Sequence, residues 1–369
     1  MALDAQRAAA AGRFVRADGA ASPAFSGFDN EHCFAVTLSA MDQMSRHAAL
    51  APLAAVDWAE RATYGAIFVL GAVLFWLSDA HPSAMPFWAP WDFSPSIYLA
   101  TALTLYWYWR GLALSGAETR PPIWRRSFFL LGLFLTYFVL QTRFEYWSQH
   151  MFFLNRIQSL MMHDIGPFLI ALGWPGAMIE AGMPPWIRRF VKSRFVTAVV
   201  RVCLQPAVAT FLFIGIFYFW LIPAVHFRAM IDHWLYALMN WSMIIGGVVF
   251  WCLVLDPRPK PPARLSFGMR AALTVGVSFP QTVLGAVITF VPQDLYSFYD
   301  LCGRLFPSIS PLSDQRTGGI VSWIPPGMMS TIGLVLVLNF LRLHEEAITE
   351  TQDDASATLA ALAARWTGR

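Results

Sequence analysis

Residues 150–175 read HMFFLNRIQSLMMHDIGPFLIALGWP, and the predicted fold follows from this stretch. It is long and apolar enough to cross a bilayer as a helix, which takes about 20 residues. Five polar residues nevertheless occur at membrane depth: Asn155, Arg156, Ser159, His163 and Asp164. An ionisable group at the bilayer centre costs about 2.5–3.5 kcal/mol. We therefore predict an internal polar site that other helices surround.

The first four of these polar side chains fall on one side of the predicted helix. At 100° per residue they lie within an arc of roughly 100°. Because lipid cannot satisfy Arg156, we expect this side chain to face the interior and to pair with backbone carbonyls or with a carboxylate. The candidate carboxylates are Glu145, Asp232 and Asp314.

The chain as a whole has the composition of an integral membrane protein. Of its 369 residues, 57% are hydrophobic and 13% are charged, against roughly 25% charged in soluble domains. The mean hydropathy is +0.49. The four cysteines show neither CxxC nor zinc-ligand spacing, so they predict no disulfide or metal framework. We expect the lipid bilayer as a partner, and no nucleic acid.

Eight apolar stretches are each near the length that crosses about 30 Å of hydrocarbon. They cover residues 62–79, 95–115, 126–143, 150–173, 203–224, 231–255, 268–291 and 320–342. The predicted fold class is therefore all-α, a polytopic transmembrane helix bundle of about eight spans within residues 61–345. A partly disordered tail, residues 1–60, precedes the bundle, and a second tail, residues 346–369, follows it.

Lysine and arginine are concentrated in the connections after the second, fourth and sixth predicted spans. Because positively charged connections stay in the cytosol, we predict that both termini are cytosolic. The connections at the opposite end carry many aromatic residues, which we interpret mainly as an interfacial belt. These are Phe87, Trp88, Trp91, Tyr146, Trp147, Tyr296, Phe298 and Tyr299.

The start of the sixth predicted span, HFRAMIDHW, carries a candidate metal site. His226, Met230 and His233 are spaced i, i+4, i+7 and would share one helix face within about 60°. Imidazole together with thioether suits a soft or borderline metal such as Cu(I). The alternative is that the histidines solvate a helix end at the interface while Met230 packs in the core.

The two histidines of the opening stretch belong to different layers, since His163 lies about 20 Å from His150 by helical rise. His163 beside Asp164 is compatible with a proton or metal relay. It is equally compatible with a hydrogen-bonded group that packs helices together. The sequence leaves both interpretations open.

A further motif, SDQRTGGIVSWIPPGMM, occupies residues 313–329. Its glycine pair permits close backbone approach, and its proline pair bends the chain. We favour a structured re-entrant cap over the membrane here, the alternative being an ordinary loop that leads into a kinked helix.

Four groups of residues together carry a family resemblance, one of them being Leu284-Gly285 with Phe290-Val291-Pro292 and Tyr296. The first is Gly166-Pro167 with the run 171–175, and the second is His226 with His233. The most specific group is Asp314, Gln315, Gly318, Gly319, Trp323 and Pro325. In this pattern the chain resembles the CtaG-type cytochrome c oxidase assembly factors, the polytopic family found with caa-type oxidases. The likeness covers about residues 60–345. It departs at Asn155, Ser159 and Asn240, where that family carries histidines, so we expect a divergent member.

The resemblance implies a non-enzymatic, multi-pass protein of the bacterial inner (cytoplasmic) membrane that assists maturation of a haem-copper oxidase. It further implies that His226, Met230 and His233, with His150, hold Cu(I) at the outer leaflet. The ion would then pass by ligand exchange to an oxidase subunit or an extracytoplasmic copper chaperone. A copper importer or resistance-type protein is one alternative, and a metal-free structural assembly scaffold is another. We expect no haem, because two axial histidines need matching depth and only His163 lies at mid-depth.

Overall fold

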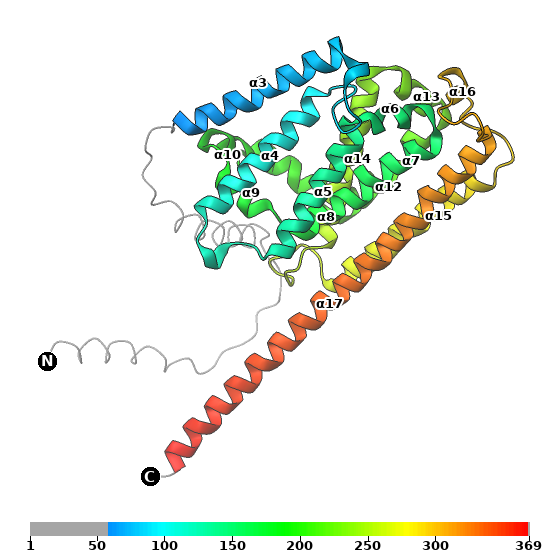
Figure 1. Cartoon of the computed structure of the whole chain (residues 1–369). Helices are drawn as coiled ribbons and strands as arrows, with labels where there is room; N and C mark the ends of the chain where they lie inside the picture. The colour runs from blue at the N-terminus through cyan, green and yellow to red at the C-terminus, as the bar shows by residue number, and fades with distance from the viewer. Residues whose placement is uncertain (1–57, 368–369) are drawn as a thin grey trace.

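The computed structural model describes residues 58–367, which form helices joined by short connections and contain no strand (Figure 1). The predicted all-α fold is therefore confirmed for this part of the chain. The predicted N-terminal tail lies outside the described residues, except that residues 58–60 begin the first helix, α3.

The helices differ widely in length. In chain order they are α3 (Trp58–Ala80), η1 (Pro82–Ala84), α4 (Pro95–Leu114), η2 (Ala117–Thr119), α5 (Ile123–Gln141), α6 (Arg143–His150), α7 (Phe152–Leu160), η3 (Met161–Ile165), α8 (Gly166–Gly173), α9 (Gly176–Gly182), α10 (Pro185–Val191), α11 (Arg194–Cys203), α12 (Pro206–Leu221), α13 (Pro223–Ile231), α14 (His233–Val254), α15 (Phe267–Phe290), α16 (Phe298–Leu301) and α17 (Pro311–Thr367). Of these, η1 and η2 are 3₁₀ turns and η3 is a π-helical turn.

Five helices in residues 58–367 are long and apolar enough to cross a membrane: α3, α5, α14, α15 and α17. Two bent pairs raise the number to seven if each pair is one span. These are the α7–α8 segment with α9, bent by 74°, and α11 with α12, bent by 72°. A helix therefore occurs at each of the eight predicted places, with α4 at the second. How many of them cross the membrane, and which way the termini face, remain predictions.

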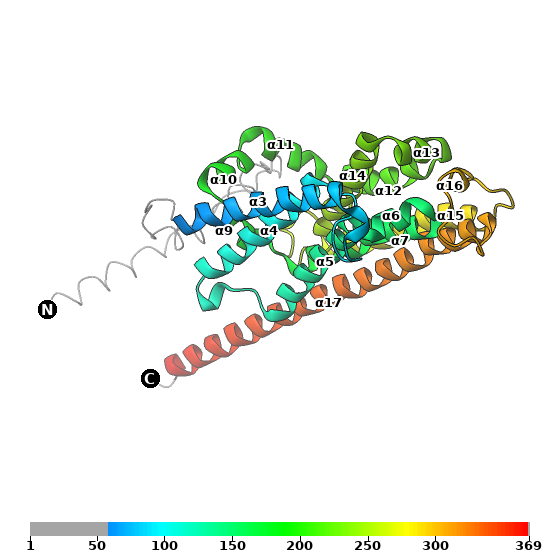
Figure 2. The same cartoon turned by 45° about the horizontal axis from the view of Figure 1, so that its top comes forward.

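The longest helix, α17, has 57 residues and lies along one side of the molecule (Figure 1). It packs against α15 and then continues beyond the other helices, as two views show (Figures 1 and 2). Residues 313–329 are its first turns, so the prediction of a re-entrant cap or loop there is wrong. Pro325 and Pro326 lie inside this helix. The predicted boundary at residues 345–346 also falls within it, without a break.

Connections at one end of the bundle contact one another. At one end Arg264 Nη1 donates to the carbonyl of Arg201 at 3.1 Å, and the Arg258 guanidinium lies 5.4 Å from the centre of the Trp174 ring. These contacts join two of the three connections that are rich in lysine and arginine, those after the fourth and sixth predicted spans. We call this end of the molecule the basic end.

The opening stretch is not one continuous α-helix. The π-helical turn η3 separates α7 from α8, and Pro167 in the next turn has no N–H to offer the carbonyl of His163. Gly247 of α14 lies against that carbonyl so closely that a Cβ there would be 2.2 Å from its oxygen. The π turn thus widens the helix where α14 approaches it most closely.

Candidate functional site

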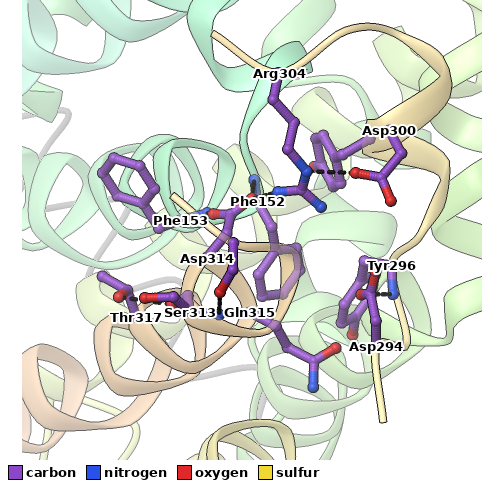
Figure 3. Close-up of polar contacts among 12 residues, drawn as sticks. Phe152, Phe153, Asp294, Tyr296, Asp300, Arg304, Ser313, Asp314, Gln315 and Thr317 are labelled. Atoms are coloured by element: carbon purple, nitrogen blue, oxygen red, sulfur yellow. Dashed lines mark hydrogen bonds and ion pairs between the residues drawn. The ribbon is translucent and has the colours of Figure 1, made fainter. Parts of the chain in front are cut away.

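The start of α17 is joined to α7 by the side chain of Asp314 (Figure 3). Its carboxylate accepts the backbone N–H groups of Phe152, at 3.0 Å, and of Phe153, at 2.8 Å. These N–H groups lie in the first turn of α7, where the helix itself offers no acceptor. The residue at the N-cap position, Met151, makes no side-chain cap hydrogen bond. A carboxylate from a distant part of the chain therefore caps α7, and its negative charge suits a helix N-terminus.

The same carboxylate also holds the connection between α15 and α17. Arg304 Nη1 donates to Asp314 at 2.7 Å, and both side chains are nearly buried (Figure 3). The neighbouring side chain of Gln315 accepts the N–H of Leu295 at 2.6 Å. It donates to the carbonyls of Ile288, at 3.2 Å, and Gln293, at 3.0 Å. Asp314 and Gln315 thus fix residues 291–310 to the first turn of α17.

Glycines in the same motif allow α17 to approach its neighbours. A Cβ at Gly318 would lie 2.3 Å from the Phe152 ring, and one at Gly319 would lie 2.4 Å from Thr289 Oγ1. Trp323 packs in the same manner on Gly285 of α15, where a Cβ would be 2.7 Å from Trp323 Cβ. Pro325, half-buried, lies further along α17. This motif is therefore a packing motif.

Arg156 of α7 is 2% exposed and lies at the centre of a second group. Its Nη2 donates to Asn155 Oδ1, its Cζ is 5.2 Å from the centre of the Phe152 ring, and its Nε has no hydrogen-bond partner. The prediction that Arg156 faces the interior is confirmed. Its predicted partner, a carboxylate or backbone carbonyls, is wrong: within residues 58–367 no ion pair includes Arg156, and it donates to the side chain of Asn155. We call Asn155, Arg156, His226, Met230, Tyr296 and Tyr299 the Arg156 cluster.

The three carboxylates considered for Arg156 have other environments. Asp314 pairs with Arg304. Asp232 accepts the N–H of Leu235 at 2.9 Å and so caps α14. Glu145 is buried in α6, where burial and the charge of Asp92 raise its pKa well above the usual value.

His226 is fully buried in the Arg156 cluster, and both ring nitrogens have partners. Nδ1 lies 3.1 Å from the carbonyl of Trp220, and Nε2 lies 3.1 Å from the hydroxyl of Tyr299. Burial, followed by the positive charge of Arg156, lowers the pKa of His226 to about 3. The ring is therefore neutral, with Nδ1–H donating to the carbonyl and Nε2 accepting from the tyrosine hydroxyl.

The predicted metal ligands do not share one helix face. α13 ends at Ile231 and α14 begins at His233, with Asp232 extended between them, so the i, i+4, i+7 spacing does not apply. Met230 packs against the core with its sulfur 3.8 Å from Asn155 Nδ2, whereas His233 is exposed.

The fourth predicted ligand is also held elsewhere. His150 Nδ1 lies 2.7 Å from the carbonyl of Tyr146, and the two rings are 4.1 Å apart. Within residues 58–367 no three side chains among His, Cys, Asp and Glu gather in a metal-binding arrangement.

The polar stripe of the opening stretch is divided by the π turn. Asn155 and Arg156 face the cluster, whereas His163 stacks on Phe213 of α12, ring centres 4.3 Å apart, and its Nδ1 lies 2.9 Å from the carbonyl of Met243. These contacts of His163 are those of a group that packs helices together, and its common face with Asn155 and Arg156 stays a prediction. The two other members, Ser159 and Asp164, are also buried.

Two features of this region were not predicted from the sequence. Tyr296 and Tyr299 lie in the predicted aromatic belt, yet they are 2% and 0% exposed. Tyr296 stacks on Phe152 and donates to the carbonyl of Leu221 at 2.8 Å. A neighbouring network centres on Gln158, whose amide bonds to Ser148 and to the carbonyl of Val139. An uncharged glutamine in an apolar run gives no sign of this role in the sequence.

The comparisons with known proteins bear on this geometry. The family model of the cytochrome c oxidase caa3 assembly factor matches residues 104–342. The chain belongs to this family. The caa3 assembly-factor match contains the whole Arg156 cluster and the Asp314 motif, and it confirms the resemblance read from the sequence. No curated protein and no solved structure matches the chain.

Proposed function

We propose that this caa3 assembly factor acts as a non-catalytic scaffold in the bacterial inner membrane, where it binds an oxidase subunit without holding a metal ion in the Arg156 cluster. The observation that supports this proposal is the buried charge of Arg156 beside His226. Among residues 58–367 no carboxylate pairs with it. A Cu(I) ion bound by His226 would add a second positive charge to this buried place, where like charges repel strongly.

The donor atoms of the cluster support the same proposal. Binding a metal through Nε2 of His226 would break its contact with Tyr299. The sulfur of Met230 already lies against the amide of Asn155. The third predicted ligand, His233, is exposed on the next helix. The residues present therefore do not fit a copper ion in this arrangement.

The scaffold surface in this proposal is the connection 291–310. It is fixed at Tyr296 by stacking on Phe152, and at Arg304 by pairing with Asp314. Two large apolar side chains project from it, Leu301 at 81% exposed and Phe306 at 41% exposed. A fixed connection that presents apolar side chains is suited to binding another protein.

Copper delivery is the second candidate function. His226 and Met230 lie one turn apart on α13, and imidazole with thioether is a donor pair that Cu(I) accepts. In that case the partners would be an oxidase subunit and an extracytoplasmic copper chaperone. A copper importer or a resistance-type protein would use the same two ligands.

Two measurements on the same variants separate these candidates. Copper is measured on the purified chain after incubation with Cu(I), and oxidase content is measured in cells that lack the gene and carry each variant. The variants are Met230→Leu, which keeps the volume of Met230, and His233→Ala as the exposed control. The scaffold proposal predicts well under one copper per chain and normal oxidase content with Met230→Leu. One copper per wild-type chain, lost together with oxidase content in Met230→Leu, would establish copper delivery instead.

A further inference from the structure

A cavity of about 640 Å³ lies far from the Arg156 cluster, where α5, α8 and α17 meet at the basic end. Its walls are almost wholly apolar, with Phe128 from α5, Phe168 and Leu172 from α8, and Leu336 and Phe340 from α17. None of the described residues that line it is a carboxylate. An apolar cavity of this size at a junction of helices is typical of a ligand site.

One wall of the cavity is made by very close packing of α5 on α8. A Cβ at Gly173 would lie 2.6 Å from Phe129 Cβ and 2.8 Å from the carbonyl oxygen of Arg125. The two backbones therefore hold this wall in place. The facing wall is α17, whose side chains at Ile332 and Leu343 are 47% and 49% exposed at the rim. The cavity thus reaches the molecular surface along α17.

The two basic side chains of the cavity are near one helix end, and Asn339 adds a polar group further along α17. Arg125 and His344 lie there, close to the N-terminus of the 19-residue helix α5. The Arg125 guanidinium lies 5.1 Å from the centre of the Trp124 ring, and its Nε is buried without a hydrogen-bond partner. No ion pair within residues 58–367 includes Arg125. This end of the cavity is therefore positively charged and unneutralised.

The length of the cavity matches one leaflet of a bilayer. Residues 332–344 line it along α17, and 12 residues rise about 18 Å, close to half of the roughly 30 Å hydrocarbon core. Trp124 and Arg125 lie at the charged end of the cavity. Tryptophan and arginine are typical of the level of lipid headgroups. A partner helix is about 10–12 Å wide, which is too wide for this volume over that length.

We propose that this cavity binds one molecule of an anionic phospholipid. An acyl chain lies between α8 and α17, and the phosphate accepts hydrogen bonds from Arg125 beside the N-terminus of α5. The guanidinium supplies donors in the geometry that a phosphate accepts. The proposal is independent of the function assigned to the Arg156 cluster.

The test uses the full chain purified in a non-ionic detergent, with phosphatidylglycerol and phosphatidylcholine of identical acyl chains as probes. Bound lipid is counted by native mass spectrometry, and the thermal unfolding midpoint is measured with each lipid. We expect phosphatidylglycerol to be retained at one molecule per chain and to raise the midpoint more than phosphatidylcholine does. Equal binding of the two lipids would overturn the proposal, since it would show that the positive end selects nothing.

Three variants locate the site. Arg125→Gln removes the charge and should weaken phosphatidylglycerol binding about tenfold or more, as expected for a lost charge-assisted hydrogen bond. Leu336→Trp fills the cavity and should abolish binding of both lipids. Arg189→Gln, the same change at an exposed arginine of α10, should leave binding unchanged. Wild-type affinity in Arg125→Gln, or equal losses in Arg125→Gln and Arg189→Gln, would overturn the proposal.

Discussion

The carboxylate of Asp314 accepts the backbone N–H of Phe153 at 2.8 Å, although the two residues are 161 positions apart in the chain. This contact makes the N-terminus of α7 dependent on α17. Because α7 carries Asn155 and Arg156, the geometry of the Arg156 cluster depends on a residue that belongs to the motif at the start of the last helix. The most specific part of the family pattern therefore acts by positioning another helix.

Asp314→Ala should destabilise the protein by about 2 kcal/mol or more, because the cap of α7 and the buried partner of Arg304 are lost together. The thermal unfolding midpoint of the detergent-solubilised protein measures this effect. The control is Asp300→Ala, which removes the other carboxylate on Arg304. Asp300 is 47% exposed, so its loss should change the midpoint little. Equal shifts for the two variants would contradict the capping role of Asp314.

Gly318→Ala should destabilise the protein by about 1–3 kcal/mol, because the added Cβ meets the Phe152 ring and forces α17 away from α7. Gly327→Ala in the same helix is the matched control. A Cβ at Gly327 meets nothing within 4 Å, so alanine there should be neutral or stabilise the helix by up to about 1 kcal/mol. If both glycines tolerate alanine alike in thermal unfolding, close packing at Gly318 is not required.

Leu301→Asp combined with Phe306→Asp should lower oxidase content in cells while the abundance and midpoint of the protein stay normal. Both side chains are exposed, so the change removes apolar surface for a partner and not core packing. Ile231→Asp, at the 67% exposed last residue of α13, serves as the control. Normal oxidase content in the double variant would exclude the connection 291–310 as the partner surface.

Glu145→Gln should change how stability varies with pH. Burial raises the pKa of Glu145 above its unfolded value, so the folded state keeps a proton that the unfolded state releases. The contribution of protonated Glu145 to the free energy of unfolding is present at low pH. It is lost as pH rises above about 4.5, by up to about 1.4 kcal/mol per pH unit. Glutamine cannot ionise, so the variant should be close to wild type near pH 5 and more stable near pH 8. Glu118→Gln, at an exposed position, should keep the wild-type profile, and the same profile in Glu145→Gln would refute this assignment.

The helical places were predictable because apolar length is a local property of the chain. Each of the eight apolar stretches corresponds to a helix. The π turn at Met161–Ile165 was not predictable, since it arises where Gly247 of another helix meets the carbonyl of His163. His163 lies in this turn and contacts Phe213 of α12 and the carbonyl of Met243 of α14, and these contacts depend on how those helices pack.

The candidate site was predictable only in part. The free-energy cost of an arginine exposed to lipid depends on the side chain alone. It therefore predicts correctly that Arg156 faces the interior. Its surroundings depend on tertiary packing: a break at Asp232 separates His233 from His226, and the distant Arg304 pairs with Asp314. The sequence predicts a cap at residues 313–329 because a glycine pair permits close backbone approach and a proline pair bends the chain. In the structure those glycines are the places where α15 and α7 touch α17.

The length of α17 sets the distance between its two ends. Its 57 residues rise about 85 Å at 1.5 Å per residue, nearly three times the roughly 30 Å of a hydrocarbon core. One end is fixed at Asp314, and the other carries Trp366, which is 84% exposed. Two proteins that recognise these two ends would be kept at a set spacing, with α17 as the spacer between them.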